Sequence, residues 1–443
     1  MLSGLWRSEG YGWILAFDPD GYTLHHHCAA SCLAAERGTH ADFARSYDRV
    51  AVVGERLSLH QAGDLTRYDF RRVDAMPGAP SAPGGDAAPL LNFESLWGQF
   101  DEHYAFFELH GVDWRDAHRR FAPAVTAATP PQELFAIACR MLAPLDDGHV
   151  TLAGDGQVHQ RMRHQALRAA MRATFGTPNG RVTPRTTVDA VSRQFDQVFL
   201  APFTSRKPLQ RAGNGIVSWC ELAPGIGYLS VLRLFGFAES AAARGADDLP
   251  HTRAAVADFL RDDIAAFDAI LDRVFSDLRA CRALVLDLRL NGGGFDRAGL
   301  AIAARFADRR RLAFSKRARG AGQAQELHVE ATAQPYLRPV VVLTSPLCVS
   351  AGEICVLGLR ALPNVTIMGQ PTAGMLSDNL NKPLPNGWEL SLSNEIYTAA
   401  DGPVFEGRGV PPGVPCAALA APDFTGTARA ALAAAVDRAG ALA

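Results

Sequence analysis

Short segments that alternate between apolar and polar residues fill the first 75 positions of the chain. Gly21–Leu24 and Arg56–Leu59 show this period of two, and turn residues separate them from their neighbours. Such a pattern is typical of β-strands joined by tight turns. We therefore expect residues 1–75 to form a small β-rich domain. Residues 76–89, which are rich in Pro and Gly, are predicted to be a linker.

The spacing of apolar residues changes after Leu91. Aromatic residues recur every three or four positions, which predicts one stripe of an amphipathic helix, and a second helix is expected near Pro131–Leu142. We interpret residues 90–156 as a helical domain whose aromatic stripe belongs to the core. Residues 157–213 are Arg-rich and weakly patterned, and we expect a connecting segment. The stripe consists of Phe93, Trp97, Phe100, Tyr104 and Phe107.

Strand and helix patterns alternate from residue 214 to residue 443. Ala283–Leu288, apolar except for Asp287, and Val340–Thr344, apolar up to its last residue, are typical of buried strands, and Ala351–Leu362 has the spacing of a helix. Strands that alternate with helices indicate layers of sheet and helix. The predicted fold class is therefore α/β.

Composition narrows the choice of function classes. Apolar residues make up 48% of the chain, charged residues 20%, and the net charge is −2. These values argue against a disordered chain and give no electrostatic reason for nucleic-acid binding. We find no export signal or membrane segment, so we expect a soluble cytoplasmic protein that binds no membrane and whose eight cysteines are free thiols. A homo-oligomer stays possible.

Three local features could carry chemistry. The loop Asp287-Leu-Arg-Leu-Asn-Gly-Gly-Gly follows a buried strand, and consecutive glycines can expose backbone N–H groups to an oxyanion or a phosphate. No lysine or hydroxyl follows it, which disfavours phosphate. Ser350 stands where a helix begins, as a nucleophile or as a simple helix cap. His149 follows an Asp-Asp-Gly turn, either as a general base or in a structural role.

These motifs and two others occur in the order found in a known family. The strand from Gly225, the Asp287 loop and Ser350-Ala-Gly-Glu are followed by Gly369-Gln-Pro-Thr-Ala-Gly and Phe405-Glu-Gly-Arg-Gly-Val-Pro-Pro. Together they resemble the tail-specific (C-terminal processing) serine proteases, in the branch that includes the tricorn core protease. The resemblance spans about residues 91–443 and implies a crotonase/ClpP-like core that hydrolyses peptides or protein C-termini.

The resemblance also implies a role for individual residues. Ser350 would be the nucleophile, His149 its general base, and Glu406 the acidic residue that supports their hydrogen-bond network. No cofactor or metal is implied. The backbone N–H of Ala351 and of Gly293 or Gly294 would form the oxyanion hole, and Thr372 and Gly374 would contact substrate.

Departures from the family pattern leave alternatives open. The other large branch uses a lysine base about 25 residues after the serine, but that position holds Met375, and Lys382 comes seven residues later. The tricorn-like branch can carry a serine directly before the histidine, where this chain has Gly148. The stretch between Leu152 and Gly225 is too short and lacks the loop for a PDZ module, which favours small peptides as substrates.

Two readings from other classes also stay open. The chain could be a degenerate family member that binds apolar ligands or peptides without cleaving them, or an unrelated esterase.

The segment His25-His26-His27-Cys28, with Cys32 nearby, contains metal-ligating residue types. Because alternate residues of a strand point in opposite directions, only part of it could converge on one ion, and we predict a β-strand instead.

Overall fold

The computed structural model describes residues 2–84, 88–176, 184–240 and 250–443. Parts of the predicted linker (85–87), connecting segment (177–183) and core (241–249) therefore lie outside the described residues. The N-terminal unit is an antiparallel seven-stranded sheet, ordered β4-β3-β2-β1-β7-β6-β5, which confirms the predicted β-rich domain. Its elements are β1 (Gly4–Ser8), β2 (Trp13–Phe17), β3 (Gly21–Cys28), β4 (Ser31–Thr39), α1 (His40–Ser46), β5 (Tyr47–Val53), β6 (Arg56–Gln61) and β7 (Arg67–Val73).

A helical layer follows. Its first helix carries Phe93, Trp97 and Phe100 of the predicted aromatic stripe but ends at His103, so Tyr104 and Phe107 lie beyond it. Phe93, Phe100 and Tyr104 are fully buried in the core beneath this layer. The layer covers a four-stranded sheet, β18-β19-β8-β9, in which a hairpin from the last quarter of the chain pairs with strands that follow the helices. The elements are α2 (Pro89–His103), α3 (Trp114–Phe121), α4 (Pro131–Leu142), β8 (Thr151–Gly154), β9 (Gln157–Gln160), β18 (Asn379–Pro383) and β19 (Glu389–Ser393).

The C-terminal unit is a mixed α/β core around a second seven-stranded sheet, ordered β10-β11-β12-β13-β16-β17-β21. Strands β12, β13, β16 and β17 run parallel, and β13 and β16 are wholly buried. The strands are β10 (Gln210–Ala212), β11 (Val217–Ala223), β12 (Ile226–Val231), β13 (Ala283–Asp287), β16 (Val340–Thr344), β17 (Val365–Gly369) and β21 (Val414–Pro415), and the helices are α8 (Arg253–Asp277), α9 (Asp296–Ala304), α10 (Ala351–Arg360) and α11 (Phe424–Leu442).

The weakly patterned segment 157–213 is largely helical where the structure describes it. It contains α5 (Gln165–Phe175), α6 (Pro184–Phe195) and a short π-helix, η2 (Asp196–Leu200). Phe175 and Phe199 pack against each other and against Phe424 of α11. The segment therefore adds apolar side chains to the core of the C-terminal unit in addition to connecting two units.

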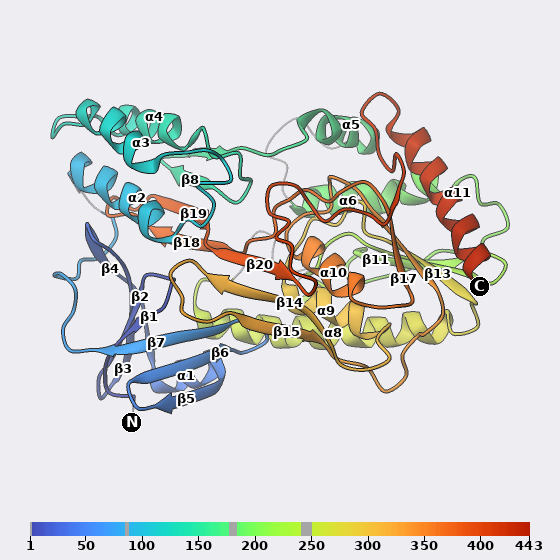
Figure 1. The fold of residues 1–443 in the computed structure, drawn as a ribbon, viewed down its shortest axis with the longest axis horizontal. Coiled ribbons are helices and arrows are strands. Elements are labelled where there is room, and N and C mark those ends of the chain that lie inside the picture. The colour runs from blue at the N-terminus through green and yellow to red at the C-terminus, as the bar shows by residue number, and fades with distance from the viewer. Residues whose placement is uncertain (1, 85–87, 177–183, 241–249) are drawn as a thin grey trace.

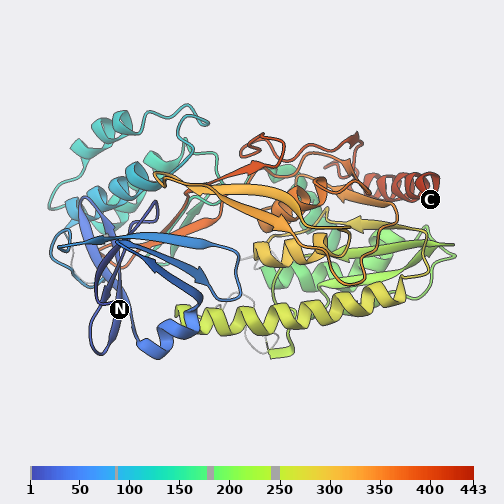
Figure 2. The same cartoon turned by 60° about the horizontal axis from the view of Figure 1, so that its bottom comes forward.

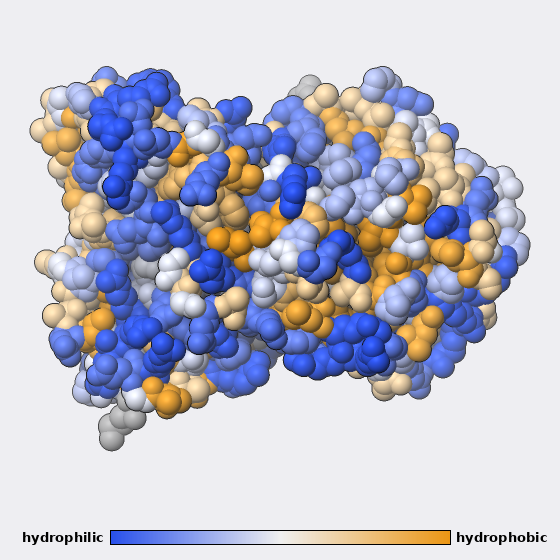
Figure 3. All heavy atoms as spheres, in the orientation of Figure 1, coloured by the Kyte–Doolittle hydropathy of each residue, from blue (hydrophilic) through white to orange (hydrophobic). Residues whose placement is uncertain are grey.

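A three-stranded sheet, β15-β14-β20, reaches from the core towards the N-terminal sheet (Figure 1). It holds β14 (Arg311–Ala318), β15 (Gln325–Val329) and β20 (Glu395–Ala399). The long helix α8 makes a second connection, because its first half packs against α1 (Figure 2). Polar and apolar residues are mixed over the face shown in Figure 3. Within the described residues, no helix combines the length and apolarity that a bilayer crossing needs.

Candidate active site

The parallel strands explain why distant motifs meet. The Gly-rich loop follows β13, the loop ending at Ser350 follows β16, and the segment around Thr372 follows β17. Because neighbouring parallel strands end at the same edge of the sheet, these three loops lie side by side. A ligand site at this edge is therefore expected from the topology alone.

Ser350 is held in an unusual backbone conformation at the start of α10. Its φ is 54° and its ψ is −129°, and a non-glycine residue at positive φ persists only where surrounding structure enforces it. Gly293 lies against it: a Cβ added at Gly293 would lie 2.8 Å from the Cβ of Ser350 and 2.9 Å from the carbonyl oxygen of Val349. Only glycine fits there, so the structure brings the Gly-rich loop directly against Ser350.

The backbone N–H groups beside Ser350 differ in what they contact. The N–H of Gly293 donates to Oδ1 of Asn291 at 2.9 Å. Within the described parts of the chain, no hydrogen bond occupies the N–H of Gly294 or of Ala351, the first residue of α10. In the β-bridge between Gly294 and Leu234, the N–H of Leu234 donates to the carbonyl of Gly293, and the N–H of Phe295 donates to the carbonyl of Leu234. The N–H of Gly294 itself therefore points away from Leu234.

Glu353, one turn into α10, ties the loop after β17 to Ser350. Its buried carboxylate accepts the N–H groups of Ser350 at 3.2 Å and of Gly374 and Met375 at 2.8 Å each, as well as the hydroxyl of Thr372. Burial raises the pKa of Glu353 to about 7, although these hydrogen bonds stabilise the carboxylate and oppose the rise. Thr372 and Gly374 thus direct their donors to Glu353, and their contact with substrate stays a prediction.

His149 lies in the loop between α4 and β8, where it is buried. Its backbone N–H donates to Oδ1 of Asp147 at 2.9 Å, and its imidazole lies beside the backbone carbonyl of Ser377. Nδ1 of the ring is buried without a hydrogen-bond partner among the described residues. Burial lowers the pKa of His149, and the charge of Asp147 opposes that shift. The neutral imidazole, which can accept a proton, is therefore favoured.

One small apolar cluster connects the His149 loop to the Ser350 loop. Val349 and Met375 are buried together, with Met162 packed against them. A Cβ added at Gly148 would lie 2.4 Å from Cε of Met375. Gly148, next to His149, contacts Met375 of this cluster, and Val349, next to Ser350, belongs to it. Among the described residues, no hydrogen bond joins His149 to Ser350. The tight contact also explains why glycine stands where the related proteases can have serine.

Glu406 is buried next to the same segment. One of its carboxyl oxygens, Oε2, accepts the N–H groups of Leu376 and Ser377, both at 2.9 Å. Burial raises the pKa of Glu406 well above its ordinary value, and the charges of Asp147 and Glu353 add to the shift. Among the described residues no hydrogen bond joins Glu406 to His149, and the backbone of Ser377 contacts both.

The lysine alternative fails on geometry. Lys382 lies in β18, fully buried, and its Nζ donates to the backbone carbonyls of Tyr11 and Gly12. The three histidines lie in β3, the strand that the sequence predicts there, and within the described residues no group of three or more His, Cys, Asp or Glu could hold a metal ion.

Sequence reasoning missed four residues that contact this site. In the sequence alone, Asp147, together with Asp146, stays open between a metal ligand and a turn residue, and Tyr104 is assigned to the core, while Glu353 and Ser377 receive no role. One signal was available, because a tyrosine in an otherwise apolar aromatic stripe usually brings its hydroxyl to a partner. Tyr104 does so here, donating to Oδ2 of Asp147 at 3.0 Å.

Comparisons with known proteins agree with this geometry. Residues 256–416 match the model of peptidase family S41, and residues 87–143 match the tricorn protease C1 domain. No curated protein matches the chain. Its fold is similar to that of a protein from Parabacteroides merdae ATCC 43184, provisionally described as a peptidase, with 24% identity over 80% of this chain and 97% of that one and a TM-score of 0.57.

Two further solved structures match with lower scores. The photosystem II D1 C-terminal processing protease is 16% identical over 75% of this chain and 94% of that one, with a TM-score of 0.42. The tricorn protease is 11% identical over 96% of this chain and 45% of that one, with a TM-score of 0.43. The family models carry the comparison: the segment 256–416 matches the serine peptidases of family S41, which are hydrolases, and the helical layer before it matches the tricorn C1 domain.

Proposed function

We propose that the chain hydrolyses peptide bonds with Ser350 as nucleophile, His149 as general base and Glu406 as the supporting acidic residue. The single observation that carries the proposal is the backbone of Ser350, held at positive φ at the N-terminus of α10 and against Gly293. A helix cap needs no such strain, whereas a nucleophile presented to substrate is a common reason for it.

The chemistry follows from the groups present. Oγ of Ser350 attacks the scissile carbonyl carbon while His149 takes its proton, and the protonated His149 then gives a proton to the leaving amine. Water, deprotonated by His149, releases the acyl group from Ser350 in the second half of the cycle. The N–H groups of Ala351 and Gly294, which have no partner among the described residues, can donate to the oxyanion. We assign that role to them, because the N–H of Gly293 already donates to Asn291.

The substrates we propose are peptides or the C-termini of proteins. The described residues between β9 and β10 form the helices α5, α6 and η2. They do not form the β-rich module that related proteases use to grip protein tails, and short peptides are therefore the first substrates to test.

Covalent labelling tests the proposal most directly. A fluorophosphonate should label the wild-type chain on Ser350, and Ser350→Ala should abolish both labelling and peptide hydrolysis. His149→Ala should lower kcat about as much as Ser350→Ala, by roughly 10⁴-fold or more, because such residues act as a unit. Ser205→Ala, at an exposed serine outside these loops, is the matched control. Unlabelled wild-type protein that binds peptides would instead indicate a non-catalytic member.

A further inference from the structure

A second carboxylate besides Glu406, that of Asp147, lies beside His149. Asp147 is buried, with 4% of its surface exposed, and both of its oxygens are engaged. Oδ1 accepts the backbone N–H of His149 at 2.9 Å, and Oδ2 accepts the hydroxyl of Tyr104 at 3.0 Å. Tyr104 follows the last residue of α2 and is completely buried. The carboxylate is thus fixed from the helical layer.

Glu406 is poorly placed to carry the charge that an imidazolium needs. Its oxygen Oε2 holds two backbone N–H groups of the 376–377 segment. Burial raises its pKa, and the nearby charge of Asp147 raises it further, which favours the protonated carboxyl. Two carboxyl groups that share one buried site do not both ionise readily. The charge of Asp147, by contrast, acts on His149 and favours its protonated form.

We propose that Asp147, held by Tyr104, is the positioning residue that places a negative charge beside His149, while Glu406 fixes the backbone of Ser377. The inference rests on the proposed role of His149 as the general base. An ionised carboxylate beside the histidine lowers the energy of the transition state, in which the ring becomes an imidazolium. The helical layer would therefore supply both the base and the charge that stabilises its protonated form.

Other titratable groups also face this carboxylate. His110 stacks on Tyr104 with ring centroids 6.3 Å apart. Burial lowers the pKa of His110, and the charges of Asp147 and Asp146 oppose that shift. Asp146 forms an ion pair with Arg163 at 3.4 Å. Any pH profile of the site therefore includes these groups besides Glu406, and each comparison below changes one group against the same background.

Asp147→Asn is the sharpest test, because it keeps the shape and an acceptor for the N–H of His149 and removes the charge, although its NH₂ group no longer accepts the hydroxyl of Tyr104. We expect kcat to fall about 10²- to 10³-fold with KM within about threefold. The acid limb of kcat/KM should move to lower pH, because the remaining environment of His149 disfavours its protonated form. Tyr104→Phe should shift the same limb in the same direction by a smaller amount, since the Asp147 carboxylate loses the donor that stabilises its charge and holds it beside His149.

Asp146→Asn is the matched control, since it removes an equal charge one residue earlier from a side chain that is 51% exposed. It should leave kcat within about twofold and the limb in place, because solvent screens exposed charges. A folded Asp147→Asn protein with unchanged kcat and an unchanged limb would overturn the proposal. So would a fall in Tm with no movement of the limb.

Two further comparisons keep the outcome decisive. If Asp147→Asn does not fold, Tyr104→Phe decides, because an unmoved limb in that variant rejects the role of Asp147. Fluorophosphonate labelling of the same samples separates this inference from the proposed function. Loss of labelling in Ser350→Ala together with full activity in Asp147→Asn rejects only the role of Asp147, whereas an active Ser350→Ala rejects the proposed function itself.

Discussion

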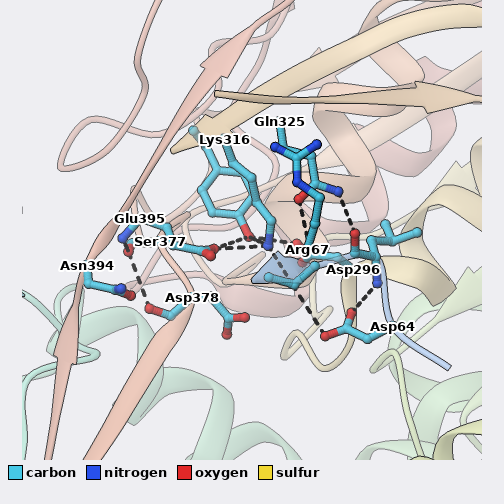
Figure 4. A network of polar contacts seen from close by, with 12 residues as sticks. Asp64, Arg67, Asp296, Lys316, Gln325, Ser377, Asp378, Asn394 and Glu395 are labelled. Atoms are coloured by element: carbon cyan, nitrogen blue, oxygen red, sulfur yellow. Dashed lines mark hydrogen bonds and ion pairs between the residues drawn. The ribbon is translucent and has the colours of Figure 1, made fainter. Parts of the chain in front are cut away.

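Two buried polar clusters meet at Ser377 and differ in how completely they are satisfied. In the first cluster, Nζ of Lys316 contacts Thr66 at 2.7 Å, Glu395 at 3.0 Å and Tyr397 at 3.3 Å (Figure 4). In the second, around His149, the carboxyl groups face hydroxyl and N–H donors, and Nδ1 of the histidine has no partner among the described residues. The hydroxyl of Ser377 accepts the N–H of Glu395, while its own N–H donates to Glu406.

The fully paired cluster around Lys316 holds units of the fold together, whereas the cluster around His149 contains a group that can take up a proton. Buried polar groups are normally hydrogen-bonded, and a group left without a partner calls for an explanation. Burial alone would lower the pKa of Lys316, but the charges of Glu395 and Asp296 outweigh it and raise the pKa, so the ammonium form is favoured. His149 is kept neutral, and its Nδ1 has no partner among the described residues, which suits the proton exchange that we propose for it.

The largest expected effect comes from breaking the first cluster. Lys316→Met should lower the free energy of unfolding by about 3–5 kcal/mol, because it leaves the carboxylate of Glu395 buried without its cation. For the folded fraction, counted by fluorophosphonate labelling, kcat should stay within about threefold of wild type. Chemical denaturation and active-site counting on one preparation measure both quantities.

The double variant Lys316→Met/Glu395→Gln is the control for this prediction. It removes the unpaired charge and should recover part of the lost stability. A Lys316→Met protein with wild-type stability but greatly reduced kcat would show that the two clusters cannot be separated.

A smaller effect is expected at Glu406. Glu406→Gln should lower kcat by about tenfold and KM should change less, because the residue acts on His149 through Ser377 and contributes less than a direct acid or base. If Glu406 only anchors the loop that follows it, Tm would fall and kcat of the folded enzyme would be unchanged. Steady-state kinetics and a melting curve on one purified variant distinguish the two roles.

The core could be predicted from sequence because its signals are local. Runs such as Val340–Thr344 are buried strands, and the rule that parallel strands end at one edge brings Gly293 and Ser350 together. The pairing of β19 with β8 could not be predicted. It joins Leu390 to Leu152 across more than 200 residues, and an apolar period shows which face is buried but not which strand pairs with it.

The candidate site residues come from sequence motifs, and their catalytic roles stay predictions. Ser350, His149 and Glu406 carry recognisable motifs, and the structure places Ser350 and Glu406 in loops joined through Glu353 and the 372–377 segment. The roles of Asp147 and Tyr104 depend on a contact between a turn and a helix end, which neither pattern shows on its own.

A modest effect is expected on stability at acid pH, in the interface between β3 and α2. Burial, followed by nearby positive charge, lowers the pKa of His27 to about 4. The unfolded chain then binds more protons between pH about 6.5 and about 4, so stability should fall as pH decreases through this window. Buried His103, whose pKa is also lowered by burial, then by Lys382, adds to the slope.

His103→Leu tests this pH dependence, because it removes a titrating ring whose two nitrogens lack hydrogen-bond partners among the described residues. Its Tm should fall less steeply than that of wild type between pH 7 and pH 5. A slope identical to that of wild type would assign the acid lability to other groups, such as His26, which burial and Lys382 also keep neutral.

The smallest effect is expected at Lys382, where the pKa and the geometry point in opposite directions. Burial lowers the pKa of Lys382 to about 7, a value suited to a lysine base. Its Nζ nevertheless donates to the carbonyls of Tyr11 and Gly12, in the contact between β18 and the N-terminal sheet. Lys382→Met should therefore leave kcat/KM within about twofold, with any loss confined to Tm, because two buried carbonyls lose a donor. An inactive Lys382→Met protein with a native melting curve would restore the lysine as the base and remove that role from His149.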